Sequence, residues 1–501
     1  MILNGCGRRV KLRVLYASAE LTPLASTGGL GDVAAALPAA LRELGIQVVR
    51  IIPFYRSVRE GVTRVVEKFS CAVSLGSRRV PVRIWQIATA DGVPTFAVDI
   101  PEYFDRRELY GIGGEDYEDA AERFIAFQKA ILSFATWFPE TPQIIHCNDW
   151  HTGLIPALIH AARSGWNDGI RRVAQVRTVL TIHNLAYQGM FPPDCLDLVG
   201  LPASYFTWKA MEFYGMVNFL KAGITFSDSI TTVSPTYARE IQQPGLGCGL
   251  HGLLRERAGR LRGILNGVDY RMWNPRRDRH IPRNYDASDL RGKVICKRVV
   301  LREMGLPQRK GYALLGMVTR LVGQKGLDII DGGLEAMLRL PVQLILLGTG
   351  ERRFQDMCRR WALHHPERIA VRIAFDQGLA HRIEAGSDIY LMPSRYEPCG
   401  LNQIYSLAYG TIPVVHDTGG LADTVVDARA DPIAGTGFKF APYCGEALLK
   451  ALGAAVAMYT SERRLWLGMV RRAMAQDFSW ARAAREYAGL YKGLLAGGHN
   501  I

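Results

Sequence analysis

Several features that would define other classes of protein are missing from this chain of 501 residues. No apolar run reaches the roughly 20 residues that a membrane-spanning helix needs, and residues 1–14 become strand-like too soon for a secretory leader. The nine cysteines are scattered, odd in number and never spaced as Cys-x-x-Cys, which argues against a disulfide framework and against structural zinc. We therefore expect a cytoplasmic protein that does not contact a membrane.

Familiar nucleotide and metal signatures are also absent. The chain has no Walker A pattern, and the turn Gly348–Gly350 is followed by Arg353 where a dinucleotide-binding motif needs its third glycine. His146, His151 and His183 lack a metal-binding spacing such as His-Glu-x-x-His. These absences argue against an ATPase, a dinucleotide-dependent enzyme and a metal site. The turn Gly348–Gly350 is either a ligand-binding turn or only a turn.

The charge balance is basic, with 61 lysines and arginines against 47 acidic residues and a formal net charge of +14. A nucleic-acid binder would add a basic run, a basic tail or a recognisable motif, and the sequence has none of these. We expect no nucleic-acid partner and favour an arginine-rich enzyme that handles phosphates. With 48% apolar and 22% charged residues the chain is an ordinary globular protein, and its length predicts two domains.

Short β-branched runs alternate with longer helical patterns along the whole chain. This alternation predicts parallel sheets flanked by helices, with ligands at the carboxyl ends of the strands. The strands form two series that separate near Gly259–Pro275, a stretch rich in glycine, asparagine and proline. The expected strands are Val14–Ala17, Val48–Pro53, Val82–Ile87, Thr95–Val98, Ile144–His146, Arg177–His183 and Ser229–Val233 in the first series, and Ala313–Thr319, Gln343–Leu347, Ile369–Ala374, Ile389–Pro393 and Ile412–Val415 in the second.

Two helices can be placed from their apolar spacing. One covers Gly29–Leu44, and we expect Pro38 to kink it. The other lies near the C-terminus, where Ser479 can cap a helix that carries Tyr487 and Tyr491 on one face. The sequence alone leaves open whether this last helix packs on the domain that precedes it.

The tetrapeptide Thr-Gly-Gly-Leu occurs twice, at Thr27–Leu30 and at Thr418–Leu421. Each copy lies between an expected strand and an expected helix, and each runs on to an aspartate, Asp32 or Asp423, after one small residue. A strand, a glycine turn and a helix start form an anion site when their N–H groups are unpaired. The two copies therefore predict two domains that share one phosphorylated ligand.

Two further segments of the second series carry charge at expected strand ends. Arg320 and Lys325 follow one strand, close to Gly326, and two cations there would suit a diphosphate leaving group. The alternative is a pair of solvated loop charges. Glu397 lies on a loop between a buried strand and a helix, where it either accepts hydrogen bonds from sugar hydroxyls or caps the helix; the adjacent Pro398 favours a ligand role.

In the first series, polar residues follow two of the expected strands. His183 lies at one strand end and is either a sugar-contacting group or a satisfied structural histidine. The other candidate motifs are Asn148–Gly153, Ser234–Glu240 and Asn266–Asp269.

Taken together, these segments resemble bacterial glycogen synthase and plant starch synthase. The resemblance covers nearly the whole chain, from Val14 to about Tyr491, and its motifs stand in the order found in that family. They are Thr27–Val33, Asn148–Gly153, Ile182–Gly189, Ser234–Glu240, Asn266–Asp269, Arg320–Asp328, Pro393–Gln403 and Thr418–Val425.

The resemblance implies an α/β protein of two Rossmann-like domains with a deep interdomain cleft, the B-type glycosyltransferase fold. We place the acceptor-side domain at 1–262, the nucleotide-sugar-binding domain at 263–476, and at 477–501 a C-terminal helix that returns to the N-terminal domain. The implied reaction transfers glucose from ADP-glucose, the nucleotide-sugar donor, to the non-reducing end of an α-1,4-glucan acceptor (glycogen or maltodextrin) with retention of configuration. No metal ion and no cofactor are expected.

The resemblance also implies roles for individual residues. Arg320 and Lys325 would hold the diphosphate, and Glu397 and His183 would lie beside the donor glucose. Phe375 would stack on adenine, and Tyr405 stands where related B-type transferases often carry a second glutamate. The other donor-side residues are Gly29, Gly350, Cys399, Leu401, Thr418, Gly419 and Gly420, and the sugar-side residues are Asp32, Asp149 and Asn266.

One position departs from the family pattern. The first motif usually begins Lys-x-Gly-Gly-Leu, with a lysine that helps to bind the donor, and Ser26 occupies that place here. A charge-assisted contact of about 1.5–3 kcal/mol is therefore missing, unless another cation replaces it. The departure keeps two alternatives open: a related retaining transferase that uses UDP-glucose or another acceptor, and a catalytically impaired glucan-binding protein.

The stereochemistry of the implied reaction can arise through a glycosyl-enzyme or through front-face attack. No obvious carboxylate nucleophile stands among the matched positions, so we favour front-face attack with the leaving phosphate as the base.

Overall fold

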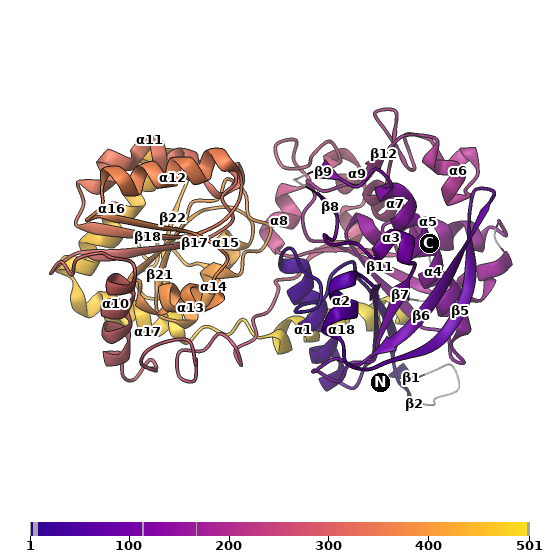
Figure 1. The fold of residues 1–501 in the computed structure, drawn as a ribbon, viewed down its shortest axis with the longest axis horizontal. Coiled ribbons are helices and arrows are strands. Elements are labelled where there is room, and N and C mark those ends of the chain that lie inside the picture. The colour runs from indigo at the N-terminus through magenta and orange to yellow at the C-terminus, as the bar shows by residue number, and fades with distance from the viewer. Residues whose placement is uncertain (1, 4–8, 113–114, 167, 498–501) are drawn as a thin grey trace. The chain divides into compact units, whose positions relative to one another are not determined.

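The computed structural model describes residues 2–3, 9–112, 115–166 and 168–497. The chain forms two compact units, residues 1–267 with 480–501 and residues 268–479 (Figure 1). The boundaries expected from the sequence, after residues 262 and 476, lie close to these positions. Because the second unit is one continuous segment, the chain passes between the units twice.

The first unit is built on a mixed sheet of nine strands in the order β16-β15-β11-β10-β3-β4-β7-β6-β5. All neighbours from β16 to β7 pair in parallel, and β6 and β5 extend the sheet as antiparallel strands. The strands are β3 (Arg13–Ala17), β4 (Gln47–Pro53), β5 (Val65–Leu75), β6 (Arg78–Ile87), β7 (Thr95–Asp99), β10 (Ile144–Asn148), β11 (Arg177–Ile182), β15 (Ser229–Thr232) and β16 (Leu261–Gly263).

Helices connect the parallel strands of this unit. The principal ones are α1 (Gly29–Glu43), α4 (Ala120–Trp137), α5 (Ile155–Arg163), α7 (Phe219–Phe226) and α18 (Trp480–Ala496). Shorter helices are α2 (Arg56–Gly61), α3 (Pro101–Phe104), α6 (Cys195–Val199), α8 (Pro235–Glu240) and α9 (His251–Glu256). Two short strand pairs are β1 (Ile2–Leu3) with β2 (Arg9–Val10) and β8 (Gly111–Ile112) with β9 (Glu115–Asp116). A small three-stranded sheet has the order β12 (Met190–Phe191), β14 (Met216–Asn218) and β13 (Glu212–Phe213).

Helix α18 belongs to the first unit although it ends the chain. It packs against α1, and its Tyr487 and Tyr491 are fully buried in the core of that unit. The Tyr491 hydroxyl lies 2.6 Å from Nδ1 of His146 on β10. The return of the last helix to the N-terminal part of the chain, which the family resemblance implied, is therefore present.

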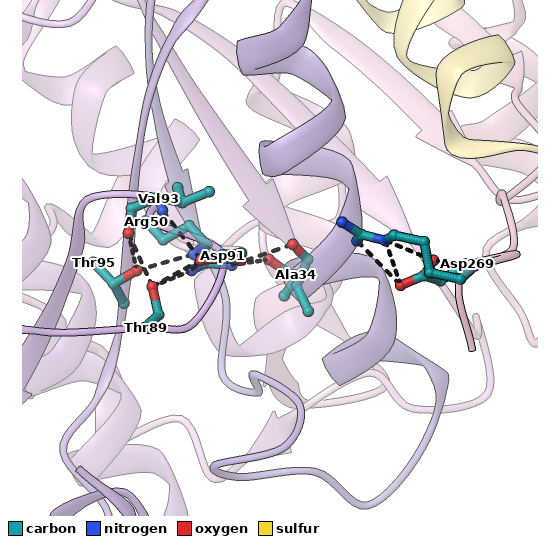
Figure 2. A network of polar contacts seen from close by, with 9 residues as sticks. Ala34, Arg50, Thr89, Asp91, Val93, Thr95 and Asp269 are labelled. Atoms are coloured by element: carbon teal, nitrogen blue, oxygen red, sulfur yellow. Dashed lines mark hydrogen bonds and ion pairs between the residues drawn. The ribbon is translucent and has the colours of Figure 1, made fainter. Parts of the chain in front are cut away.

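Helix α1 runs through Pro38 as one element, with the help of a buried arginine. Pro38 has no N–H, so the carbonyl of Ala34 loses its usual donor four residues on. Arg50, on β4 and 1% exposed, donates from Nη1 to the carbonyls of Ala34 and Ala35 at 3.3 and 3.2 Å (Figure 2). The arginine thus supplies the hydrogen bond that the proline removes.

The remaining donors of Arg50 are also satisfied. Its guanidinium makes a bidentate pair with Asp91 at 2.7 and 2.8 Å, and it donates to the hydroxyls of Thr89 and Thr95 at 3.0 Å each (Figure 2). All five N–H groups of a buried guanidinium therefore have partners, which is the condition under which such burial is tolerated. The pair ties α1 and the loop before β7 to the centre of the sheet.

The second unit is built on a six-stranded sheet in which every neighbouring pair is parallel, in the order β19-β18-β17-β20-β21-β22. The strands are β17 (Ala313–Val318), β18 (Val342–Gly348), β19 (Ile369–Ile373), β20 (Ile389–Met392), β21 (Ile412–His416) and β22 (Phe438–Phe440). The helices are α10 (Arg291–Glu303), α11 (Leu327–Leu338), α12 (Arg352–His364), α13 (Gln377–Gly386), α14 (Asn402–Ala408), α15 (Gly419–Thr424), α16 (Gly445–Ser461) and α17 (Arg463–Met474).

Alternate side chains of the central strands serve two different cores in this unit. Leu314 and Ile345 pack with α10 and α13 on one face, whereas Leu315 and Leu344 pack with α11, α12 and α16 on the other (Figure 1). A sheet buried on both faces needs strands that are apolar throughout. This is why these strands are readable as short continuous apolar runs.

Both units have the strand order of a Rossmann fold. In chain order the parallel strands of the second unit lie 3-2-1-4-5-6, and those of the first unit from β7 to β15 lie in the same order. In this topology the ligand binds outside the carboxyl ends of the first and fourth strands, where the order reverses. That point lies between β3 and β10 in the first unit and between β17 and β20 in the second.

Candidate active site

In the first unit, the loop after β3 carries a buried carboxylate that sequence reasoning missed. Glu20 is 4% exposed and accepts hydrogen bonds from the backbone N–H and the hydroxyl of Thr27, at 2.9 and 2.7 Å, and from Gly28 N–H at 3.4 Å. The Tyr110 hydroxyl donates to it at 2.8 Å. The expectation of unpaired N–H groups in the first Thr-Gly-Gly-Leu copy is therefore wrong for Thr27 and Gly28, because the protein's own carboxylate occupies them.

Ser26, which replaces the family lysine, is exposed, and its hydroxyl donates to the carbonyl of Gly28 at 3.1 Å. It lies close to Gly31 in the first turn of α1, where an added Cβ would stand only 2.6 Å from Ser26 Oγ. The serine side chain thus lies against the start of α1. Its short side chain brings no charge to the place where the family resemblance implies a lysine.

Asn148, Asp149 and His183 meet at the carboxyl ends of β10 and β11. The Asn148 amide nitrogen donates to Ala17 O at 2.9 Å, which fixes the orientation of the amide. Its Oδ1 then accepts from Tyr16 Oη at 3.0 Å and from Nε2 of His183 at 2.9 Å. Because an amide oxygen only accepts, the His183 proton lies on Nε2 and Nδ1 keeps a lone pair.

Asp149 is held in an unusual backbone conformation beside that histidine. Its φ is +55°, rare for a residue other than glycine, and its Oδ1 accepts the His183 N–H at 2.8 Å. Burial raises the pKa of Asp149 to about 7, against the lowering effect of the backbone N–H bonds it accepts. Burial also lowers the pKa of His183 to about 3, so the imidazole is neutral near pH 7. Such displaced pKa values gather at functional sites.

The other sugar-side candidates lie in the same unit. Asp32, in the first turn of α1, has its pKa raised by burial and also by the charge of Glu20. Asn266 is 6% exposed, and its buried Oδ1 has no hydrogen-bond partner in the part of the chain that the structure describes. An unsatisfied buried acceptor of this kind is costly unless a ligand supplies a donor. Tyr110, which sequence reasoning also missed, stacks on His151 at 4.9 Å.

In the second unit, Lys325 and Glu397 form an ion pair beside the switch point. Lys325 Nζ lies 2.6 Å from Oε2 of Glu397, and Ser394 Oγ donates to the same oxygen at 3.0 Å. The side chains are 14% and 9% exposed. Gly326, at φ +76°, allows the approach because a Cβ there would lie 2.0 Å from the carbonyl oxygen of Pro393. The sequence suggested two separate roles for residues that the structure joins directly.

Arg320 follows β17 on the same side of the sheet. It is exposed, and within the described residues no hydrogen bond or ion pair of its side chain is found. Its loop runs beside the turn after β18, where Leu321 N–H donates to Thr349 O at 2.8 Å. A Cβ on Gly350 would lie 2.3 Å from the Leu321 carbonyl oxygen, so that glycine is required for this pairing.

The second Thr-Gly-Gly-Leu copy also uses its backbone differently from the expectation. Thr418 N–H donates to His416 O at 2.9 Å, and Gly420 N–H donates to Glu397 O at 3.0 Å. A Cβ on Gly419 or on Gly420 would lie within 2.0 Å of the carbonyl oxygen of Glu397 or Cys399, respectively. The expected unpaired N–H groups are therefore wrong for Thr418 and Gly420, and the glycine pair serves to hold the Glu397 loop against α15.

Three aromatic rings form a stack behind the same loop. Trp273 lies between Tyr405 on α14 and His381 on α13, at ring-centroid distances of 3.9 and 3.8 Å and angles of 6° and 4°. His381 is fixed in turn by Asp278, whose carboxylate lies 2.7 Å from Nδ1. The stack therefore sets the position of Tyr405. Sequence reasoning missed Trp273, which lies far from Tyr405 along the chain.

The remaining donor-side candidates differ in exposure. Phe375, just after β19, is 95% exposed and so offers a free aromatic face. Cys399 is buried, and its carbonyl accepts a hydrogen bond from the Gln403 side-chain amide at 3.0 Å. Leu401 is half-buried and packs against the core of the unit. Both contacts hold the loop against the unit.

Two Rossmann-like units, each with polar groups at its topological switch point, have the architecture of a B-type glycosyltransferase, and the comparisons place the chain in the retaining class of these enzymes. Residues 13–256 match the starch synthase catalytic domain family, and residues 305–465 match the group 1 glycosyl transferases. The chain is 48% identical to a glycogen synthase of Anaeromyxobacter dehalogenans over 96% of this chain and 100% of the relative. It is 44% identical to a glycogen synthase of Syntrophotalea carbinolica, over 96% and 98%.

Solved structures agree with this assignment. The catalytic domain of starch synthase IV from Arabidopsis thaliana, bound to ADP and acarbose, matches with a TM-score of 0.86 and 32% identity, over 97% of this chain and 100% of that one. A sucrose-phosphate synthase from Thermosynechococcus elongatus matches with a TM-score of 0.58 and 17% identity over the same shares, which shows the fold alone. The chain belongs to the glycogen synthase and starch synthase family.

No helix among the described residues is both long and apolar enough to cross a membrane. Within the same residues, no group of three or more histidine, cysteine, aspartate or glutamate side chains is arranged to hold a metal ion.

Proposed function

We propose that this protein transfers glucose from ADP-glucose to the non-reducing end of an α-1,4-glucan with retention of configuration. The observation that carries the proposal is the pairing of a full-length likeness to glycogen synthases with a cationic strand end at the second unit's switch point. The second unit binds the nucleotide sugar, and the first unit supplies the sugar-side and acceptor-side groups.

In this reaction the bond from glucose C1 to the diphosphate oxygen breaks, and a bond from C1 to the acceptor O4 forms. Negative charge grows on the departing diphosphate, and we propose that Arg320, the exposed cation after β17, binds it. Lys325 is already paired with Glu397. We propose that its ammonium group also binds the diphosphate, while Glu397 accepts hydrogen bonds from the glucose hydroxyls.

For the stereochemistry we favour front-face attack. The acceptor O4 proton passes to a leaving diphosphate oxygen, so no enzyme group needs to be glucosylated. Glu397 is poorly suited as a nucleophile because Lys325 and Ser394 both bind its Oε2. Mass spectrometry of enzyme quenched during turnover with a slow donor tests this. Any side chain carrying a covalent glucosyl group would overturn front-face attack.

The identity of the donor is the part of the proposal that Ser26 affects most. Transfer of labelled glucose into glycogen, measured with ADP-glucose and with UDP-glucose at equal concentration, decides between the two donors. We expect ADP-glucose to be preferred and Ser26→Lys to lower its KM, because the lysine restores a charge-assisted contact. Ser26→Gln is the matched control, similar in length but uncharged. Preference for UDP-glucose would replace the donor in the proposal.

An impaired glucan-binding protein is the remaining alternative. Retention on glycogen without release of ADP, in protein with an intact thermal transition, would establish it.

We further propose that transfer needs no metal, because Arg320 and Lys325 supply positive charge at the diphosphate. Activity that disappears with EDTA and returns with Mg²⁺ would contradict this. The free cysteines of the described residues support the proposed cytoplasmic location.

A further inference from the structure

Two loops of the second unit meet where Lys325 and Glu397 form their ion pair. The lysine loop, residues 320–326, follows β17, and the glutamate loop, residues 393–397, follows β20. Because β17 and β20 are neighbouring parallel strands, both loops leave the sheet at its carboxyl edge. The ion pair forms only if the two loops keep a fixed register. The contacts that set this register therefore bear on the reaction.

Gln324, the residue before Lys325, is hydrogen-bonded to the glutamate loop in both directions. Its side-chain amide donates to the Tyr396 carbonyl at 2.9 Å, and its own carbonyl accepts the Arg395 N–H at 2.8 Å. Arg395 and Tyr396 are the two residues before Glu397. Lys325 alone would not fix this register, because its ammonium group is a point charge on a flexible stem. Gln324 joins the chain just before the lysine to the chain just before the glutamate.

The side chain of Arg395 makes a second tie, to the helix that follows the lysine loop. Its Nη2 lies 2.8 Å from Oδ2 of Asp328 in the first turn of α11, and its guanidinium carbon lies 4.6 Å from the centre of the Tyr443 ring. The Tyr443 hydroxyl donates to the other carboxylate oxygen of Asp328 at 2.6 Å. A carboxylate and an aromatic ring thus hold the guanidinium in one orientation.

The second tie lies near the surface, where it adds little to global stability. The side chains of Arg395 and Asp328 are 56% and 42% exposed. Exposed ion pairs of this kind contribute little, because water and salt screen them. Two residues further along the chain, however, Glu397 is buried beside Lys325. A shift of about 1 Å in a group that contacts the reacting substrate can lower the rate on the order of a hundredfold. The ties can therefore matter more for the reaction than for folding.

We propose that Gln324 and Arg395 are positioning residues of the transfer reaction, which hold the lysine loop and the glutamate loop in the register that brings Lys325 to Glu397. Both act through Glu397 and the glucose it contacts, not on the donor directly. This inference rests on the proposed function. Arg320 precedes both ties along the chain, so the binding of the diphosphate should depend on them only weakly.

The test removes one tie at a time in the full chain. Gln324→Met and Arg395→Met keep nearly the same side-chain length but lose the polar group. With ADP-glucose and glycogen we expect kcat to fall about tenfold for each variant, and Tm to stay within about 2 °C of the wild type. Arg395→Lys keeps the charge opposite Asp328 and should recover part of kcat. Arg360→Met, at an exposed arginine on α12, is the control and should behave as the wild type.

Two further measurements separate positioning from a general loss of structure. In calorimetric titrations without acceptor, the Kd of ADP should change less than about twofold, whereas the Kd of ADP-glucose should rise about fivefold, because Glu397 contacts only the glucose. In a Glu397→Gln background, Gln324→Met and Arg395→Met should cost little further kcat, since the group through which they act is already altered.

Unchanged kcat in both variants would overturn the proposal. Equal weakening of ADP and ADP-glucose would do so as well, and so would the same loss of kcat with and without Glu397→Gln, because either pattern marks a general structural role. If the wild type transfers no glucose but both variants still weaken the binding of ADP-glucose and not of ADP, the positioning role stands and the proposed transferase function falls. The two failures are therefore distinguishable.

Discussion

Arg50 and Pro38 offer a quantitative test of how α1 is supported. Replacing Arg50 with methionine leaves the Asp91 carboxylate without its cation and Ala34 O without a donor. Removing one partner of a buried pair costs about 3–5 kcal/mol, and we expect the lower end, about 3 kcal/mol or about 6 °C in Tm, because Asp91 is 25% exposed and water partly solvates it. In the Pro38→Ala background a main-chain N–H becomes available to Ala34 O. The cost of Arg50→Met should then be smaller by about 1 kcal/mol, the value of one hydrogen bond.

The assay is thermal unfolding of four full-length proteins: wild type, Arg50→Met, Pro38→Ala and the double variant. Pro156→Ala provides the control, because Pro156 lies in the first turn of α5, where the helix needs no N–H from it. We expect no coupling between Pro156→Ala and Arg50→Met. An equal cost of Arg50→Met with and without Pro38 would refute the idea that the arginine replaces the missing helical bond.

Three further predictions concern the candidate site. Lys325→Met should lower Tm and abolish most transfer. Adding Glu397→Gln should restore part of the Tm, since the glutamine leaves no buried charge unpaired. Failure of the double variant to recover any Tm would contradict the pairing. Asp149 has a pKa of about 7 in the folded protein against about 3.9 unfolded, so stability should fall as pH rises from about 4 to about 7, by at most about 1.4 kcal/mol per pH unit. Asp149→Asn should flatten this dependence of Tm on pH. Phe375→Ala should raise KM for ADP-glucose without changing Tm, whereas Leu363→Ala, 76% exposed in the same unit, should change neither.

The parallel strands could be predicted because their apolar composition reflects their burial. Strands such as β17 and β20 are buried on both faces, so they are short apolar runs bounded by polar and glycine residues. The long strand β5 was missed, because Glu67, Lys68 and Ser70 are exposed along it and break the apolar signal. Strand β22 has only three residues and gives no pattern at all.

The candidate site was partly predictable for a similar reason. Residues directly after a strand, such as Arg320 and His183, can be placed from the strand itself. Glu20 and Trp273 act through contacts with residues that no local pattern connects to them. The two glycine motifs show the limit most clearly. Their spacing indicated exposed N–H groups, but Glu20 and the Glu397 carbonyl use several of these groups, which only the fold can reveal.

The position of α18 has a consequence for synthesis of the chain. The second unit, residues 268–479, is complete on the ribosome before α18 is made, whereas the first unit lacks Tyr487 and Tyr491 until the last residues emerge. Until then His146 has no partner for its Nδ1, and the α1 face that α18 covers meets water. The domain that begins first is thus the one that finishes last, an inversion of the usual vectorial order. A premature stop after residue 479 would leave the second unit complete and the first unit without its last helix.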